Sequence, residues 1–477
     1  MRGEGQFPVR LAFRERGKVR FVSHRDVARA FDRAFRIEQL PLAFTEGFSP
    51  RPKVSFGLAL SVGHESEAEY LDVRLTDPVD LDALPGLTRR DRIVNRMHAG
   101  LKSLFKKNGV ELIAGRATFI DDTTVEVQIF DETGAPTGET RRLTARDFVI
   151  ATGSSVRKIP GFEADGQIIV SSDDIVTGTF KPRSVIVVGG GAVGCEFASY
   201  FRDLGAETTI VEMLPALVPL EDRDASKELT RAFGKRGIAI HVAHRIVEGS
   251  LTKRADGVAL SIEPMEGGAA LPLTADLLVI AAGRVPNSGA LGLEATGVKV
   301  ERGFIQVDAQ MRTASPHIYA VGDVIGGLQL AHVAAHEGLI AAQAIAEQPI
   351  HAISYVKQPR ATYCRPEVAS VGATSQELER DGVPFVAGQV PFLAIAKAHV
   401  GGDADGFCKV LRHADTGEVL GVHMVGPKVT DLIAEASLAL ELGATASQLG
   451  GTTHPHPTLS EIVGEAALVS IGRSVNF

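Results

Sequence analysis

The chain has 477 residues, of which 44% are hydrophobic and 23% charged, and it carries a net charge of −8. This length exceeds one ordinary domain, and the composition excludes a disordered chain. The negative charge excludes a protein that binds nucleic acid over its whole surface. No long apolar segment and no signal peptide are found, which predicts a cytoplasmic protein that does not enter a membrane.

The first 87 residues have the pattern of a small α+β segment. Strands are expected at residues 9–13 and 19–22, and an apolar stripe predicts a helix at 25–36. Residues 1–60 carry a net charge of +6, so the remainder carries −14, which indicates two parts of different character. Prolines and aspartates at residues 77–86 predict a linker.

After the linker the pattern alternates between strands and helices, which predicts parallel sheets with crossover helices and an α/β fold. The strongest strand is expected at residues 184–188. The other expected elements are a basic helix at 91–107, a strand at 110–113, hairpin strands up to 147, a strand at 148–151, and tail helices at 428–443 and 460–469.

A glycine-rich turn follows the strongest strand. It has the spacing GxGxxG and leads directly into an apolar helix; its residues are Gly189, Gly190, Gly191, Ala192, Val193 and Gly194. The first glycine allows the tight turn, the second lets a pyrophosphate approach the backbone, and the third permits close packing of helix on strand. The helix N-terminus offers free N–H groups to the phosphates. The alternative is a glycine turn that only packs.

An acidic residue marks the preferred dinucleotide. Glu212 ends the next strand, 18 residues after Gly194, and no arginine follows it directly. A carboxylate at this place suits the ribose hydroxyls of NAD and repels a 2′-phosphate. The sequence therefore favours NAD over NADP.

From Thr88 onward the chain resembles the flavin-dependent pyridine nucleotide–disulfide oxidoreductases, and among them the dihydrolipoamide dehydrogenases. The resemblance rests on motifs in the family's order. They are Ala151-Thr-Gly-Ser154, the NAD fingerprint, Ala282-Gly-Arg-Val-Pro-Asn287, Ile318-Tyr-Ala-Val-Gly-Asp323, Leu330-Ala-His332 and His454-Pro-His-Pro-Thr-Leu-Ser-Glu461.

The resemblance implies two nucleotide-binding, Rossmann-like domains, of which the FAD domain is incomplete, and an α+β dimerisation domain. The implied parts are 1–87 (N-terminal segment), 88–153 (partial FAD-binding domain), 154–283 (NAD-binding domain), 284–347 (returning FAD segment) and 348–477 (dimerisation domain). It implies NAD and FAD as cofactors and no metal. Beside the fingerprint and Glu212, the implied cofactor-binding residues are Ala117, Thr152, Gly153, Ser154, Gly283, Gly322, Asp323, Leu330, Ala331 and His332.

The same resemblance assigns catalytic roles. His456 is similar to the family's base and Glu461 to its orienting carboxylate, and the pair serves the partner subunit, which implies a homodimer and a lipoamide-bearing complex as partner. Glu196 resembles the glutamate beside the flavin ring; an ordinary glutamate of a first helical turn is the alternative. His454 matches no catalytic position, so a surface histidine or a weak metal site is expected there.

Two features of the family are missing from the sequence. No GxGxxG precedes Gly189, and the three cysteines, Cys195, Cys364 and Cys408, cannot form the family's Cys-x4-Cys redox pair. Buried structural cysteines are expected instead. Transfer of electrons to lipoamide is therefore expected to be absent or severely reduced.

Residues 1–86 resemble the start of the radical-SAM-linked family of uncharacterised proteins, on Lys18–Asp26, Glu46–Gly57 and Gly63–Ser66. A basic face with His24, Arg25 and the loop of Arg51 and Lys53 could bind RNA or phosphate. A solvated helix face is the simpler interpretation, and nucleic-acid binding is not expected. Three hypotheses follow: an NAD/FAD oxidoreductase, a catalytically impaired NAD-binding dimer without flavin, and an RNA-related module defined by the N-terminal segment.

Overall fold

The computed structural model describes residues 7–15, 54–56, 66–75 and 87–474. The chain divides into two compact units, Met1–Leu112 and Ile113–Phe477. In the first unit three strands form an antiparallel sheet in the order β1-β3-β2. Its elements are β1 (Phe7–Glu15), β2 (Val54–Phe56), β3 (Ser66–Leu75) and α2 (Leu87–Lys107).

The expected strand at residues 9–13 lies within β1, and α2 confirms the basic helix. The strand expected at 19–22, the helix at 25–36 and the linker at 77–86 lie outside the described residues. The strand expected at 110–113 is wrong. Gly109 has a φ of +67° and Val110 N–H donates to the carbonyl of Phe105, so this segment closes the C-terminus of α2 instead of joining a sheet.

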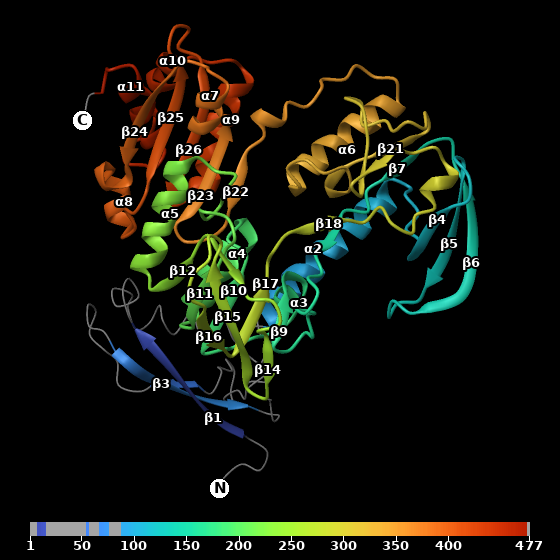
Figure 1. Cartoon of the computed structure of the whole chain (residues 1–477), viewed down its shortest axis with the longest axis horizontal. Helices are drawn as coiled ribbons and strands as arrows, with labels where there is room; N and C mark the ends of the chain where they lie inside the picture. The colour runs from blue at the N-terminus through green and yellow to red at the C-terminus, as the bar shows by residue number, and fades with distance from the viewer. Residues whose placement is uncertain (1–6, 16–53, 57–65, 76–86, 475–477) are drawn as a thin grey trace, which may run out of the picture. The chain divides into compact units, whose positions relative to one another are not determined.

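The centre of the second unit is a five-stranded parallel sheet in the order β12-β11-β10-β17-β9 (Figure 1). Its strands and helices are β9 (Ile169–Ser171), α3 (Ser172–Thr177), β10 (Ser184–Val188), α4 (Ala192–Asp203), β11 (Glu207–Val211), α5 (Arg223–Lys235), β12 (Ile238–His241) and β17 (Leu277–Ile280). A four-stranded antiparallel sheet is inserted before β17. It consists of β13 (His244–Ile246), β14 (Thr252–Arg254), β15 (Gly257–Pro264) and β16 (Leu271–Ala275).

Both faces of β10 are buried, as expected for a central parallel strand. Val185 and Val187 belong to a core cluster that also contains Phe201 of α4. Ile186, between them, belongs to a second cluster that contains Leu260 of β15. The alternation along β10 therefore buries one face against helices and the other against the inserted sheet.

The segments before and after this sheet combine into a smaller region. An antiparallel sheet, β4-β5-β6, accompanies a two-stranded parallel sheet of β7 and β21. The elements are β4 (Gly115–Phe119), β5 (Thr124–Phe130), β6 (Pro136–Thr144), β7 (Phe148–Ile150), β8 (Ser154–Val156), β18 (Arg284–Pro286), β19 (Val300–Glu301), β20 (Phe304–Ile305), β21 (Ile318–Ala320) and α6 (Ala331–Ile345).

The C-terminal part is a five-stranded antiparallel sheet in the order β22-β23-β26-β25-β24, with helices packed on it. Its elements are β22 (Arg360–Thr362), β23 (Glu367–Gly372), α7 (Ser375–Arg380), β24 (Phe385–Pro391), α8 (Ala396–Gly401), β25 (Phe407–His413), β26 (Val419–Gly426), α9 (Val429–Glu441), α10 (Ala446–Gly451) and α11 (Glu461–Ser470). The two expected tail helices are confirmed as α9 and α11. The architecture as a whole is the expected mixed α/β fold.

Candidate functional site: a dinucleotide loop and a histidine–glutamate pair

The glycine-rich loop lies between the carboxyl end of β10 and the first turn of α4. Gly189 has a φ of +111°, and a Cβ there would collide with the backbone of Ala281. A Cβ on Gly194 would collide with the carbonyl of Gly189. A Cβ on Gly191 would have no heavy atom within 4 Å. Two glycines are therefore required by packing, whereas Gly191 faces open space into which a phosphate can fit.

The loop is directly connected to the acidic residue. The Gly190 N–H donates to Oε2 of Glu212 over 2.5 Å, and the Leu214 N–H donates to Oε1 over 2.7 Å. No side chain caps the N-terminus of α4 at Gly191, and Ala192 and Val193 are exposed. The free N–H groups of this helix and a fixed carboxylate thus lie on one loop, which suits a pyrophosphate and its neighbouring ribose.

Glu196 lies one turn further along α4. Its Oε1 accepts a hydrogen bond from the Tyr363 N–H over 2.8 Å. Burial raises the pKa of Glu196, and that hydrogen bond only partly offsets the effect. No hydrogen bond or ion pair described for residues 87–474 joins it to His456 or Glu461. The structure thus places Glu196 on the helix that follows the loop.

Two residues expected to contact flavin, Ser154 and Asp323, are hydrogen-bonded to each other. Ser154 Oγ donates to Oδ2 of Asp323 over 2.5 Å, and Arg284 Nε donates to the same Ser154 Oγ over 2.6 Å. Arg284 Nε is also 3.7 Å from Asp323. The Gly322 N–H donates to the buried carboxylate of Glu337, on α6. Strand β8 and strand β21 thereby bring Ser154 and Asp323 together, although 169 residues separate them.

Asn287 is hydrogen-bonded to the turn at Thr152 and Gly153. Asn287 Nδ2 donates to the carbonyl of Thr152 over 2.9 Å, and the Asn287 N–H donates to the carbonyl of Gly153. The Arg157 N–H donates to the carbonyl of Gly283. The chain passes between the two regions at residues 152–157 and again at residues 283–287, and hydrogen bonds join these two segments.

The remaining residues expected at the flavin lie at two places. Leu330 precedes α6, Ala331 and His332 are exposed in its first turn, and His332 Nε2 lies 2.8 Å from the carbonyl of Pro359. Ala117 is exposed on β4 and pairs with Val127 of β5. The Ala282–Asn287 motif contains Arg284 and Asn287, but the sequence analysis assigned no role to these residues or to Glu337. Their hydrogen bonds supply one.

The histidine–glutamate pair forms at the start of α11. His456 Nδ1 lies 2.8 Å from Oε1 of Glu461, whose Oε2 accepts from the Thr458 N–H over 2.9 Å. The His456 side chain is 73% exposed. Partial burial raises the pKa of Glu461, but the hydrogen bonds from His456 and Thr458 outweigh it and lower the pKa overall. An ionised carboxylate therefore orients an accessible imidazole, which can take up a proton.

All three cysteines are free and buried. Burial raises the pKa of Cys195 to about 12, and it also raises the pKa values of Cys364 and Cys408. Cys195 and Cys364 share one core cluster. Because the thiolate is the reactive form, these thiols are poor nucleophiles and are structural, as the sequence analysis expected.

A buried ion network was missed by the sequence analysis. Lys409 Nζ lies 2.9 Å from Oδ1 of Asp222 and 2.6 Å from Oδ2 of Asp224. Lys409 and Asp222 are 5% and 0% exposed. Burial alone would raise the pKa of Asp222, but the charge of His423 and hydrogen bonds from Ser375 and Lys409 lower it. The network joins the start of α5 to β25 and carries no sequence signal, because its members are up to 187 residues apart.

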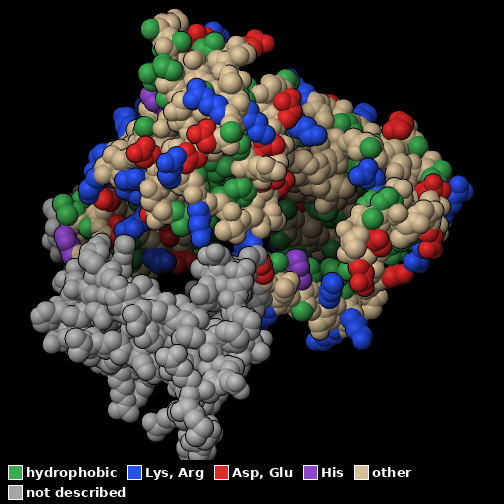
Figure 2. Space-filling model, turned by 90° about the horizontal axis from the view of Figure 1, so that it is seen from below, with side chains coloured by type: hydrophobic (Ala, Val, Ile, Leu, Met, Phe, Trp, Pro, Cys, Tyr) green, Lys and Arg blue, Asp and Glu red, His purple; other side chains and the backbone are tan. Residues whose placement is uncertain are grey.

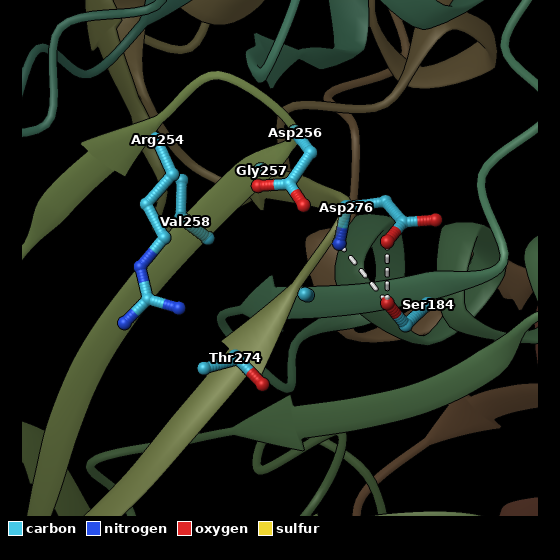
Figure 3. A pocket seen from close by; sticks show the side chains of 8 residues that line it. Ser184, Arg254, Asp256, Gly257, Val258, Thr274 and Asp276 are labelled. Atoms are coloured by element: carbon cyan, nitrogen blue, oxygen red, sulfur yellow. Dashed lines mark hydrogen bonds between the residues drawn. The ribbon is translucent and has the colours of Figure 1, made fainter.

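A small polar pocket lies at the opposite end of β10 from the glycine loop (Figure 3). Ser184 Oγ lies 3.2 Å from Oδ1 of Asp276 and accepts from its N–H over 3.0 Å. Arg254 and Asp256 complete the polar lining. The volume of about 150 Å³ is below the roughly 300–1,000 Å³ typical of ligand pockets. This pocket therefore does not compete with the loop as a nucleotide site.

One face of the described part of the chain shows no extended basic patch. On the face drawn in Figure 2, lysine and arginine side chains alternate with aspartate and glutamate, and no broad area has a single sign. His24, Arg25, Arg51 and Lys53, the residues considered for RNA or phosphate, lie outside the described residues.

Two models of one known protein family match this chain. Residues 44–338 match the model of "Pyridine nucleotide-disulphide oxidoreductase", and residues 358–467 match the dimerisation domain of the same family. The first match begins well before residue 88, and the comparisons do not support the resemblance of residues 1–86 to the radical-SAM-linked family. No helix in the described part of the chain is long and apolar enough to cross a membrane.

The chain is 39% identical to a dihydrolipoyl dehydrogenase of Bacillus subtilis over 392 residues, which are 82% of each chain. It is also 39% identical to a dihydrolipoyl dehydrogenase of Zymomonas mobilis over 399 residues, 83% of each. Among solved structures, LpdA of Mycobacterium tuberculosis superposes with a TM-score of 0.72 at 29% identity, covering 82% of this chain and 83% of that one. The flavoprotein disulfide reductase RclA of Escherichia coli shares the fold, with a TM-score of 0.67 at 24% identity over 79% and 85% of the chains.

Proposed function

This chain belongs to the pyridine nucleotide–disulphide oxidoreductase family, and from that premise we propose a dihydrolipoyl dehydrogenase-like oxidoreductase that binds NAD(H) but has lost exchange with lipoamide. One observation carries the NAD assignment. The Gly190 N–H and the Glu212 carboxylate are hydrogen-bonded at the carboxyl edge of the parallel sheet, beside the uncapped N-terminus of α4.

Each part of this edge has a distinct task. Gly191 and the N–H groups of α4 hold the pyrophosphate, because the backbone there is open and the helix dipole favours negative charge. Glu212 accepts hydrogen bonds from the adenosine ribose and disfavours a 2′-phosphate. Glu196 lies where the nicotinamide end would dock, and its carboxylate is held there by the Tyr363 N–H.

The family also uses FAD, and part of a flavin site fits the residues present. Asp323, positioned by Ser154, suits ribityl hydroxyls, and the uncapped N-terminus of α6 suits a polar ring edge. The single GxGxxG of the sequence belongs to β10, so no second fingerprint supplies the usual cradle for the flavin pyrophosphate. A bound flavin would supply acceptance of hydride from the nicotinamide.

His456 and Glu461 provide proton transfer. Glu461 holds Nδ1 of His456, which leaves the exposed Nε2 edge free to accept a proton from a molecule outside this subunit. We propose a homodimer through residues 348–477, in which this pair serves the partner's site. The other boundaries, residues 1–87, 88–153, 154–283 and 284–347, and a cytoplasmic location belong to the same proposal.

The state of the cysteines determines which electron acceptors this chain can use. A dithiol exchange needs two accessible sulfurs close together, and all three thiols of this chain are buried with raised pKa values. We therefore expect the electrons to pass to acceptors that need no protein disulfide, such as quinones or oxygen. The proposal includes a lipoamide-bearing complex as a physical partner.

The test uses the purified full-length chain. We expect NADH binding and, where flavin is retained, oxidation of NADH with a quinone but not with lipoamide. An absorption spectrum measures flavin per chain, and a titration of NADH fluorescence with the protein measures binding. Failure to bind NADH would refute the NAD assignment, and rapid lipoamide reduction would refute the loss of exchange.

A second candidate is a catalytically impaired NAD-binding dimer without flavin. The single glycine fingerprint favours it, because the pyrophosphate of FAD lacks its usual cradle. It predicts a colourless protein that binds NADH as tightly as the first proposal expects. Flavin absorbance near one per chain would exclude it.

A further inference from the structure

A second histidine–glutamate pair lies beside His456 and Glu461. His454 Nε2 lies 2.8 Å from Oε1 of Glu435, and the His454 side chain is only 9% exposed, against 73% for His456. His454 is therefore not the surface histidine that the sequence suggested. Because Glu435 belongs to α9, this hydrogen bond fixes the segment before α11 to another helix.

The ring of His454 also packs against α11. A Cβ built on Gly464 would lie 2.8 Å from Cε1 and 2.9 Å from Nδ1 of His454. These distances are too short for any real Cβ, so the glycine is needed for the imidazole to approach the helix. His454 is thus held between α9, through a hydrogen bond, and α11, through packing.

The same helix turn carries the carboxylate that orients His456. Glu461 is three residues before Gly464, on neighbouring positions of the α11 surface. Its two oxygens bind His456 and the Thr458 N–H, and Thr458 Oγ1 donates to the carbonyl of Pro455 over 2.7 Å. Since Pro455 directly follows His454, the anchor and the oriented imidazole share one short hydrogen-bonded segment.

The two pairs are also electrostatically connected. Burial raises the pKa of Glu461, whereas the hydrogen bonds from His456 and Thr458 and the charges of His456 and His454 lower it. The titratable groups around Glu461 are therefore His454 and His456 from the preceding segment, with Glu435 facing His454 from α9.

We propose that His454 and Glu435 are positioning residues that hold the segment carrying His456 in place against Glu461. This inference rests on the proposed role of His456 as a proton acceptor. Neither residue needs to touch a substrate. They fix the path of residues 454–461, so that the carboxylate of Glu461 meets Nδ1 and the opposite edge of the imidazole stays exposed.

The experiment follows the titration of the Glu461 carboxyl group by NMR in the full-length protein with ¹³C-labelled glutamate, assigned with Glu461→Gln. His454→Leu removes the anchor and should raise the pKa of Glu461 toward the ordinary value of a glutamate. Gly464→Ala displaces the ring without removing its charge and should raise the pKa as well. His454→Gln keeps an N–H donor for Glu435 and should restore most of the original value.

Glu441→Gln is the matched control, because this glutamate is on α9 but 67% exposed, and it should change nothing. An unchanged Glu461 titration in a folded Gly464→Ala protein would overturn the proposal, including the case in which only His454→Leu has an effect through its lost charge. If His454→Leu does not fold, Gly464→Ala and His454→Gln still decide. The titration needs no NADH, so its failure is distinguishable from failure of the proposed function, which NADH binding tests.

Discussion

Two regions of this molecule use parallel strands near a nucleotide-binding motif, and they differ in how completely the sheet is built. Around β10 five strands pair, and Val187 at the centre is 0% exposed. In the other region β7 and β21 form a pair of three-residue strands, and Val149 of β7 is 45% exposed. The region with the glycine fingerprint has a five-stranded parallel sheet, whereas the parallel part of the region without one is this single pair of strands.

The comparison shows that the strand before the glycine fingerprint, β10, connects the other strands of its sheet. β10 is hydrogen-bonded to β11 on one side and to β17 on the other, so its loss would separate the remaining strands. In the flavin region no strand with that motif exists in the sequence. There, hydrogen bonds such as that between Ser154 and Asp323 hold the crossing segments together.

The largest effect is expected where the complete region joins the C-terminal sheet. Lys409→Met leaves the fully buried Asp222 without its cation, and we expect a loss of about 3–5 kcal/mol in the free energy of unfolding. Lys235→Met is the matched control. Lys235 is 62% exposed and binds Asp405, so its loss should cost less than about 1 kcal/mol in urea denaturation.

The same network predicts a pH dependence. The pKa of Asp222 is lowered in the folded state, so its stabilisation is present above its unfolded pKa of about 3.9 and is lost as the pH falls below it. Asp222→Asn should therefore flatten the acid side of the stability profile. An equally steep decline below about pH 4 in that variant would show that other carboxylates dominate.

Next in size is the nucleotide loop. Gly194→Ala places a Cβ against the carbonyl of Gly189, and we expect NADH affinity to fall about 100-fold, or roughly 2.7 kcal/mol. Gly234→Ala, in α5, meets no atom within 4 Å and should leave binding unchanged. Normal NADH titration of the Gly194→Ala protein would mean that the close packing of α4 on β10 is dispensable.

Equivalent valines test the comparison most directly. Val187→Ala should lower the free energy of unfolding by about 2 kcal/mol, because it leaves a cavity in a closed core. Val149→Ala should change it by less than about 0.5 kcal/mol, since that side chain is already half exposed. Equal losses in thermal or urea unfolding would show that the flavin region is as well packed as the NAD region.

The smallest effect concerns dinucleotide choice. Glu212→Ala removes the acceptor for the ribose hydroxyls, and we expect NADH affinity to fall about 10-fold while NADPH affinity stays the same or rises. Fluorescence titration with both nucleotides measures this. Unchanged discrimination would place the ribose away from Glu212.

The sequence predicted those features whose signals are local. One local motif spans 29 residues and contains the strand, the GxGxxG turn, the helix and Glu212. The structure confirms its elements as β10, α4 and β11, because the residues that specify each element lie within or directly beside it. The pairing of His456 with Glu461, five residues apart, was predicted from family resemblance and is present in the structure.

Features made by distant segments were missed. Asp222 and Lys409 are 187 residues apart, and Asp323 is fixed by Ser154 from 169 residues away, so no spacing rule connects them. His454 was misjudged because polarity alone does not show that Glu435 and a glycine of α11 enclose it. The strand expected at 110–113 failed because a helix C-terminus with a glycine at positive φ overrode its β-branched residues.

The central claim is that this chain has a complete NAD site but no sulfur relay beyond it. The measurement that tests it most directly is the rate of NADH oxidation by lipoamide, with the purified protein supplied with FAD. We predict no lipoamide-dependent rate above the rate without lipoamide, even where NADH binds. Turnover of about 10 s⁻¹ or more, typical of enzymes, would contradict the account.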